Sequence, residues 1–229
     1  GSNRFRGKVE TWFGDYVSSN TDLFWNIDDI SPTAQYNLMG SMSGPIIRDR
    51  ITFFVTGRKF RNDGWLYGPN AYLPQGRTRI VDGDTISATG DSSAVAMNPD
   101  DRWSGQGTLR WNIFGPLSLK LDVLGSGYES GWYQHDYRLN PNGMRNSYGY
   151  GTTVISKLTH VLTDATLYET TFSYKMNEDE EYLYEDPYDD RYRHPDSLTS
   201  GSFEFFKAGT DLYRSFRSTR SLIGKIDLT

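Results

Sequence analysis

Residues 44–65 read GPIIRDRITFFVTGRKFRNDGW, and this stretch decides the fold class. Gly44 and Pro45 interrupt one element, and the charged residues that follow form a short link. Residues 37–44 before the link and residues 51–58 after it alternate in character at every second position, which is the period of a β-strand. Two alternating runs around a short link predict a β-hairpin. One face of the second run carries Ile51, Phe53, Val55 and Gly57.

A tight link on one side of a strand and a long polar loop on the other recur along the chain. In an up-and-down membrane barrel, the short turns lie at one rim and the long loops lie at the other. The sequence therefore predicts an all-β fold: an antiparallel up-and-down transmembrane β-barrel segment, about eight strands of a larger barrel, with long loops on one side. Besides the hairpin, strands are expected at residues 4–16, 102–113, 117–128, 147–162, 165–176 and 215–228, with a short strand pair around 77–86 that turns at Asp82-Gly83.

The alternation also assigns each strand residue to one of two faces. A charged side chain on the lipid side of a barrel costs about 2–4 kcal/mol near the midplane, so we expect the charged face to line the lumen. The residues expected to face lipid are Phe53, Val55, Trp103, Leu109, Trp111, Leu119, Leu121, Leu222 and Ile226. The residues expected to face the lumen are Thr52, Arg58, Gln106, Arg110, Lys120, Asp122, Lys225 and Asp227.

Composition narrows the class of protein further. The chain has 229 residues, a formal net charge of −5, a mean hydropathy of −0.63 and no cysteine. No apolar run is long enough for a transmembrane helix, whereas barrel strands need no such run. The lack of cysteine excludes disulfides and thiolate metal sites, and the lack of a basic stripe argues against nucleic acid as a partner. The opening residues do not read as a signal peptide, so we expect a processed chain or an internal piece, with residues 1–229 forming one partial barrel domain.

Several short segments resemble one known family, and their order and spacing agree with it. This chain resembles the first part of the β-barrel of TonB-dependent outer-membrane receptors, of the large type with an N-terminal carboxypeptidase-like regulatory domain. The segments are GSNRFRGKVE at 1–10, SGPIIRDRITFF at 43–54, RNDGWLYG at 61–68, AMNPDDRW at 96–103, LTHVLTDATLYE at 158–169, YEDPYDDRYRHPD at 184–196 and KIDLT at 225–229.

The resemblance implies a parent barrel of about 22 strands, filled by an N-terminal plug, in the outer membrane of a Gram-negative bacterium. It implies energy-coupled uptake of a nutrient, with a siderophore, a glycan, a peptide or cobalamin as the substrate. The implied partners are outer-membrane lipid, that substrate and the TonB complex, reached through parts of the parent that this sequence lacks, with a surface lipoprotein as a further candidate. Transport is therefore expected of the parent and not of this segment alone.

Aromatic residues in the long loops are the candidate ligand-binding residues. Aromatic rings stack on sugars and peptides, and loops held by a rigid wall are where binding sites are often placed. The alternative is that they pack the loops together or form the aromatic girdle of a barrel. Both interpretations apply to the whole set of loop aromatics, which is Trp65, Tyr67, Tyr72, Trp132, Tyr133, Tyr182, Tyr184, Tyr188 and Tyr192.

Residues 177–196 read NEDEEYLYEDPYDDRYRHPD and are expected to form an ordered acidic loop that folds around its tyrosines and Pro187. Its carboxylates suit calcium, but their spacing does not match the EF-hand loop, and a solvated charged loop is the simpler interpretation. His135, His160 and His194 are too scattered to predict a metal site, and no catalytic motif stands out. We therefore expect no enzymatic activity, no cofactor and no metal.

Two other functions remain open on the sequence alone. A soluble β-sandwich carbohydrate-binding module also has alternating strands and surface aromatics, and it is the main alternative to a transporter segment. A β-rich hydrolase is the weaker alternative, because paired carboxylates are common in a chain with 29 acidic residues. A sandwich would cover one face of each strand with a second sheet, and its loops would not be so unequal in length.

Overall fold

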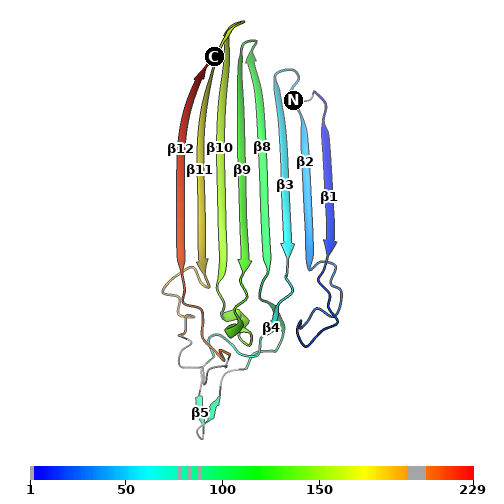
Figure 1. Ribbon diagram of the computed structural model, residues 1–229, viewed down its shortest axis with the longest axis vertical. Helices are drawn as coiled ribbons and strands as arrows, with labels where there is room; N and C mark the ends of the chain where they lie inside the picture. Colours follow the sequence, from blue (N-terminus) through cyan, green and yellow to red (C-terminus); the bar gives the residue numbers. More distant parts are fainter. Residues whose placement is uncertain (1–2, 77–78, 82–83, 87–88, 195–204) are drawn as a thin grey trace.

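The computed structural model describes residues 3–76, 79–81, 84–86, 89–194 and 205–229. One antiparallel sheet of long strands makes up most of the molecule, and its strands lie side by side in chain order (Figure 1). The strands of this sheet are β1 (Arg6–Gly14), β2 (Gln35–Ile47), β3 (Ile51–Asn62), β8 (Asp100–Phe114), β9 (Leu117–Gly131), β10 (Asn146–Thr163), β11 (Thr166–Tyr182) and β12 (Ser215–Leu228).

Smaller elements lie in the loops. Strand β4 (Tyr67–Pro69) pairs with β7 (Ala94–Ala96), and β5 (Arg79–Val81) pairs with β6 (Asp84–Ile86). Two short 3-10 helices follow β9, namely η1 (His135–Tyr137) and η2 (Pro141–Gly143). The β5–β6 pair confirms the short strand pair expected around residues 77–86, while the turn expected at Asp82-Gly83 lies outside the described residues.

The links between the long strands confirm the predicted alternation of short turns at one end of the sheet with long loops at the other. Residues 48–50, 115–116 and 164–165 connect neighbouring strands at one end of the sheet, which we call the turn rim. The long connections all lie at the opposite end, the loop rim (Figure 1). The sheet is not closed, because β1 and β12 each have only one neighbour. The structure therefore shows an eight-stranded antiparallel meander, and the closed barrel is not part of it.

Strand boundaries differ from the prediction mainly at the loop rim. The last strand coincides with the predicted residues 215–228, whereas the first is shorter than predicted, at Arg6–Gly14. The prediction of an acidic loop over residues 177–196 was wrong for its first part, because residues 177–182 belong to β11. These residues pair with β10 on one side and mostly with β12 on the other, so backbone hydrogen bonding outweighs the mutual repulsion of the acids. Alternation then places Glu178 and Glu180 on one face, and Asp179 and Glu181 on the other.

The sheet has two faces of opposite character. Cross-strand pairs place Phe53 opposite Leu109 and Leu109 opposite Leu121, and on the other face they place Arg110 opposite Lys120. We call these the apolar face and the polar face. Every residue expected to face lipid lies on the apolar face, and every residue expected to face the lumen lies on the polar face. The grouping is confirmed, while the contact with lipid or with a lumen stays a prediction.

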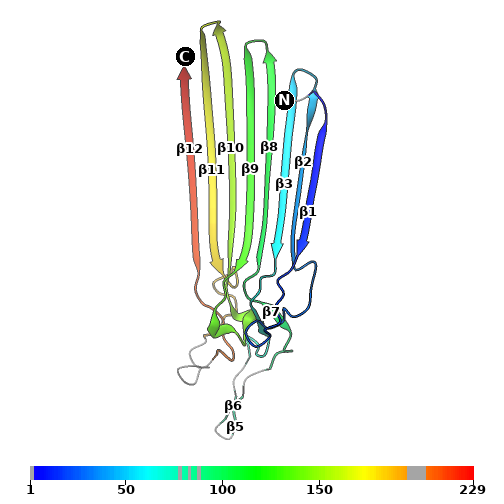
Figure 2. The ribbon, with the colours of Figure 1, turned by 45° about the vertical axis from the view of Figure 1, so that its right-hand side comes forward.

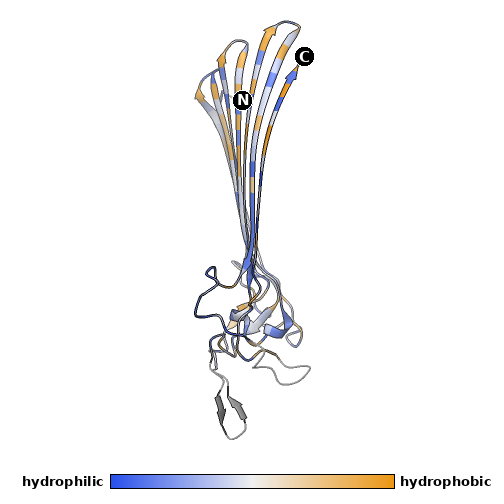
Figure 3. Ribbon diagram, turned by 90° about the vertical axis from the view of Figure 1, so that its left-hand side faces the viewer, coloured by the Kyte–Doolittle hydropathy of each residue, from blue (hydrophilic) through white to orange (hydrophobic). Residues whose placement is uncertain are grey.

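Charge on the apolar face is confined to the loop rim. One cross-strand row, the boundary row, separates the uncharged part of the apolar face from the charged part. Between this row and the turn rim, the described apolar face holds no Asp, Glu, Lys or Arg. Lys59, Asp101, Glu129 and Glu178 lie on the loop side of it. Figure 3 shows the apolar segments gathered toward the turn rim and hydrophilic ones toward the loops. The row consists of Val9, Gly40, Gly57, Gly105, Gly125, Thr152, Met176 and, in β12, Arg220, which is its one charged member.

The sheet lacks a hydrophobic core of its own. The buried apolar residues are in the loops, and on the apolar face side chains such as Val9 and Ile226 are each 75% exposed. No helix in the described part of the chain is long and apolar enough to cross a membrane. The apolar face therefore has no protein layer over it among the described residues. The buried apolar residues are Ile27, Ala34, Met97, Tyr137, Met144 and Ala208.

The β3–β8 pairing spans the longest connection and can be tested by cross-linking. Thr56 lies directly opposite Gln106, at a separation that a disulfide can bridge. In this cysteine-free chain, we expect Thr56→Cys with Gln106→Cys to form a disulfide on oxidation. Non-reducing gel mobility measures the closed loop. Thr56→Cys with Ser104→Cys is the matched control, since Ser104 lies opposite Arg58, and preferential cross-linking of this control would contradict the register.

Candidate functional site

The loops at the loop rim fold together into one assembly below the sheet (Figures 1 and 2). Its centre is a cluster of Met97, Tyr137 and Met144, against which Tyr133 and Phe206 pack. The Tyr137 and Phe206 rings lie 4.7 Å apart between centroids, and burial raises the pKa of Tyr137 above its ordinary value. Loops from three parts of the chain therefore share a small core, which fixes their positions on the sheet.

An ion-pair network ties this core to the sheet. The Arg145 guanidinium lies 2.5 Å from Asp211 and 3.1 Å from Glu181 at the end of β11, and it stacks 4.5 Å over the Tyr213 ring. Gln134 also donates a 3.0 Å hydrogen bond to Asp211. Arg145 is therefore bonded on several sides within the assembly and has a structural role.

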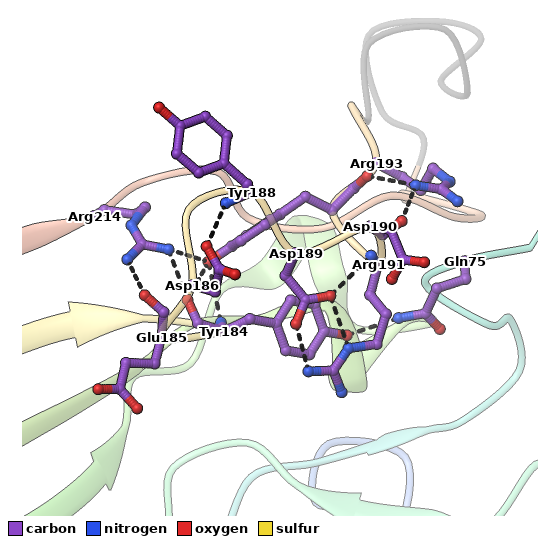
Figure 4. A network of polar contacts seen from close by, with 11 residues as sticks. Gln75, Tyr184, Glu185, Asp186, Tyr188, Asp189, Asp190, Arg191, Arg193 and Arg214 are labelled. Atoms are coloured by element: carbon purple, nitrogen blue, oxygen red, sulfur yellow. Dashed lines mark hydrogen bonds and ion pairs between the residues drawn. The ribbon is translucent and has the colours of Figure 1, made fainter.

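Residues 183–193 are ordered by a second network, centred on Tyr184 and Tyr192 (Figure 4). The Tyr192 hydroxyl donates to the Tyr184 carbonyl at 2.7 Å, and the rings meet edge to face at 5.2 Å. Arg191 lies 3.8 Å over the Tyr184 ring, and Arg214 donates to the Tyr184 carbonyl. Hydrogen bonds from Arg191 also lower the pKa of Asp189 to about 2. The loop is therefore ordered over residues 183–194, as expected, whereas residues 195–196 lie outside the described residues.

Most of the predicted ligand-binding aromatics are engaged in the loop assembly. Tyr184 and Tyr192 contact each other, Trp65 packs edge to face on Tyr16 at 5.3 Å, and the Tyr133 hydroxyl bonds His135 at 2.8 Å.

Tyr67 and Tyr72 are half-buried, and the backbone of Tyr72 donates to Leu139. Trp132 and Tyr188 stay open, at 72% and 92% exposed. The structure therefore does not bring the predicted residues together into a single site.

Tyr182 belongs to the strand and not to a loop. Its ring stacks on Tyr148 at 4.6 Å and on Phe216 at 5.8 Å, across β10, β11 and β12. All three lie on the apolar face at the loop rim, within the zone where charge begins. This placement favours the girdle alternative for Tyr182.

A hollow that the sequence analysis did not single out lies on the polar face, where β3 and β8–β11 approach the loop rim. It has a volume of about 380 Å³, within the range of small-ligand sites. We call it the rim hollow. The sequence placed Arg58 on this face, but the residues that join it come from strands far apart in the chain. The residues that define its ends and floor are Arg58, Arg102, Ser126, Tyr128, Asn177 and Asp179.

Two neighbouring cross-strand rows form the rim hollow. In one row Arg102 lies opposite Tyr128, Tyr128 opposite Gly149, and Gly149 opposite Asp179. A side chain at Gly149 would collide with the Tyr128 ring, since a Cβ there would lie 2.0 Å from a ring carbon. The Tyr128 ring therefore covers this glycine, and its hydroxyl donates to Asp179 at 3.3 Å.

The second row begins at Arg58 and ends at Asn177, with only small residues between them. Arg58 and Arg102 thus stand together at one end of the rim hollow, while Asn177 and Asp179 stand together at the other. Between these ends the floor of the second row consists of Ser104, Ser126 and Gly151.

A second hollow of about 420 Å³ adjoins the rim hollow and is lined by Trp132, Arg217 and Glu181. Among the described residues, no group of three or more acidic or histidine side chains is placed to hold a metal ion. The calcium hypothesis therefore gains no support from the acids of β11, which alternate between the two faces.

Comparison of the chain with protein-family models, with curated proteins and with solved structures found no match.

The loop assembly depends on a close approach that only glycine permits. A Cβ at Gly68 would lie 2.3 Å from the Arg138 carbonyl and 2.7 Å from the Met97 sulfur. We expect Gly68→Ala to destabilise the assembly by about 1–3 kcal/mol through overpacking, and to increase protease cleavage in residues 63–76 and 132–145. Gly115→Ala is the control, since nothing lies within 4 Å of a Cβ there. Equal cleavage of both variants would contradict the packing described.

Proposed function

We propose that this chain is the first part of the β-barrel of an outer-membrane receptor that takes up a nutrient by energy-coupled transport. The observation that carries the proposal is the distribution of charge between the two faces. On the turn side of the boundary row, the apolar face has no Asp, Glu, Lys or Arg, while the polar face there includes Arg110, Lys120, Asp122 and Lys157. Lipid on one face and a polar lumen on the other account for this difference.

The dimensions of the uncharged zone agree with a membrane span. On β8 it runs from the boundary residue Gly105 to Phe114 at the turn, and a tilted transmembrane strand needs about 9–11 residues. The stacked rings of Tyr148, Tyr182 and Phe216 lie just beyond this zone, where barrels have their interfacial aromatics.

The open edges support a larger barrel. Strands β1 and β12 each leave one row of backbone donors and acceptors without a strand partner. In lipid such edges are unfavourable, so a membrane-embedded sheet closes on further strands. The resemblance in sequence to TonB-dependent receptors supplies a parent of about 22 strands, a plug in the lumen and coupling to the TonB complex. Siderophore, glycan and peptide are the substrate classes that this family resemblance leaves open.

The sandwich alternative gains no comparable support. It needs a second sheet across one face, and the other sheets among the described residues are the two-stranded pairs β4–β7 and β5–β6. Both pairs are in the connection between β3 and β8 and not across the face of the long strands (Figures 1 and 2).

Paired arginine substitutions in the full-length parent test the proposal. Leu109 lies on the apolar face between Phe53 and Leu121, whereas Thr108 lies on the polar face and donates to Asp122. We expect Leu109→Arg to cost about 2–4 kcal/mol in lipid and to reduce outer-membrane assembly, because the guanidinium enters the bilayer. Thr108→Arg should assemble normally beside Asp122.

Outer-membrane fractionation and heat-modifiable gel mobility measure assembly. Equal effects of the two substitutions, or recovery of the unsubstituted parent in the soluble fraction, would overturn the proposed membrane orientation.

A further inference from the structure

We propose that the rim hollow binds a short extended peptide, with the peptide carboxylate at Arg58 and Arg102 and the peptide ammonium at Asp179. The inference rests on the proposed function, since it names the substrate class of a transporter whose lumen the polar face lines. It is carried by the opposite charge at the two ends of one hollow.

The arginine end is held so that it presents donors. Arg58 donates through Nε to Asn37 Oδ1 at 2.7 Å, and Arg102 donates through Nε to Asp100 Oδ1 at 2.7 Å. The Arg102 bond is also an ion pair, so Asp100 supplies a counter-charge on one side of this end, whereas Arg58 is bonded to a neutral amide. Among the described residues no hydrogen bond is made by the terminal nitrogens of either arginine, and both side chains line the rim hollow, so these N–H₂ groups are available to a ligand. A carboxylate accepts such pairs of donors in bidentate fashion.

The acidic end offers a matching acceptor. One Asp179 oxygen accepts from the Tyr128 hydroxyl at 3.3 Å, and no ion pair joins Asp179 to Arg217, the residue opposite it in β12. The neighbouring Glu181, by contrast, is already paired with Arg145. Asp179 therefore retains acceptor capacity for an ammonium group, with the Asn177 amide beside it on the same face.

The distance between the ends selects the length of the ligand. Three interstrand spacings of about 4.8 Å separate the backbones of Arg102 in β8 and Asp179 in β11, which gives about 14 Å, and Arg58 in β3 is one spacing farther away. An extended chain spans about 3.3–3.6 Å per residue, so about four residues cover this distance. Between the ends, Ser104 and Ser126 supply hydroxyls for peptide groups, and Gly151 leaves the floor low.

Charge also argues against the other substrate classes at this position. A neutral sugar would bury Arg58 and Asp179, for which no ion pair is found among the described residues, without supplying a counter-charge, and that is costly. An anionic chelate would satisfy the arginines but would meet the Asp179 carboxylate at the opposite end. A zwitterionic ligand of this length satisfies both ends.

Binding of tetra-alanine to the detergent-purified full-length parent tests the inference, with equilibrium dialysis as the measurement. Acetylation of the peptide amino terminus removes the ammonium charge, and amidation of the carboxyl terminus removes the carboxylate. We expect each cap to weaken binding about tenfold or more, since a charged hydrogen bond is lost. Maltotetraose of similar length should bind more weakly than tetra-alanine.

Variants assign the two ends. In Arg102→Gln the preference for a free over an amidated carboxyl terminus should fall, while the preference for a free over an acetylated amino terminus remains. Asp179→Asn should show the reverse pattern. Arg110→Gln is the matched control, because Arg110 lies on the same face toward the turn rim and outside the rim hollow. It should preserve both preferences.

The outcomes separate this inference from the proposed function. If the parent assembles in the outer membrane but binds capped and free peptides equally, or prefers maltotetraose, the peptide inference is overturned and the transporter proposal stands. The same conclusion follows if both variants lose both preferences equally. If the parent is recovered in the soluble fraction, the transporter proposal is overturned, and the peptide inference that rests on it is overturned with it. The comparison of capped and free peptides uses the unsubstituted protein, so it does not depend on the folding of any variant.

Discussion

The uncovered apolar face of a single-layered sheet is the constraint on which the rest of this structure depends. The long strands satisfy one another's backbone groups within the sheet, yet they supply no second layer to bury the side chains of Val9, Leu222 or Ile226. In water, an apolar surface of this extent is unfavourable, and soluble sheets of comparable length cover one face with another sheet or with helices. In a bilayer, the hydrocarbon chains provide that cover. In the proposed orientation, lipid therefore takes the place of the second layer that the sheet lacks.

The same constraint accounts for the distribution of the other residues. Charge begins on the apolar face at the boundary row, where Arg220 lies near Glu178, and it continues on the loop side, where Lys59 pairs with Asp101. The buried apolar residues occur in the loop assembly, around Met97 and Tyr137. The described chain thus concentrates its packing at the loop rim, whereas the long strands are held by backbone hydrogen bonds and, in the proposed orientation, by the surrounding lipid.

The polar face has a different balance. Near the turn rim its cations have acidic neighbours, as in Lys120 with Asp122, Lys157 with Glu169 and Lys225 with Asp227. Near the loop rim Arg102 pairs with Asp100, whereas no ion pair is found for Arg58 or Asp179 among the described residues. These two groups stand at opposite ends of the rim hollow, which makes it a part of this face suited to a ligand.

The sequence by itself determined the strands, their faces and the side of the loops, because these follow from alternation and from the length of the links. The predicted strand at residues 215–228 matches β12, and the lipid and lumen groups of residues separate onto the two faces. Alternation is a local property, so a single strand reveals it. The acids of residues 178–181 were misjudged as loop because their strand form depends on pairing with both β10 and β12, which local charge does not reveal.

Only the tertiary structure decided which residues meet. The sequence predicted Trp65, Tyr184 and Tyr192 as ligand contacts, but their partners come from elsewhere in the chain. Tyr16 packs on Trp65, while Gln75 and Arg214 donate hydrogen bonds to the hydroxyls of Tyr184 and Tyr192. The rim hollow was hidden for the same reason. Arg102 and Asp179 are far apart in sequence, and they come to the ends of one row because the register of β8, β9, β10 and β11 aligns them. Register is set by the packing of whole strands, and no single segment encodes it.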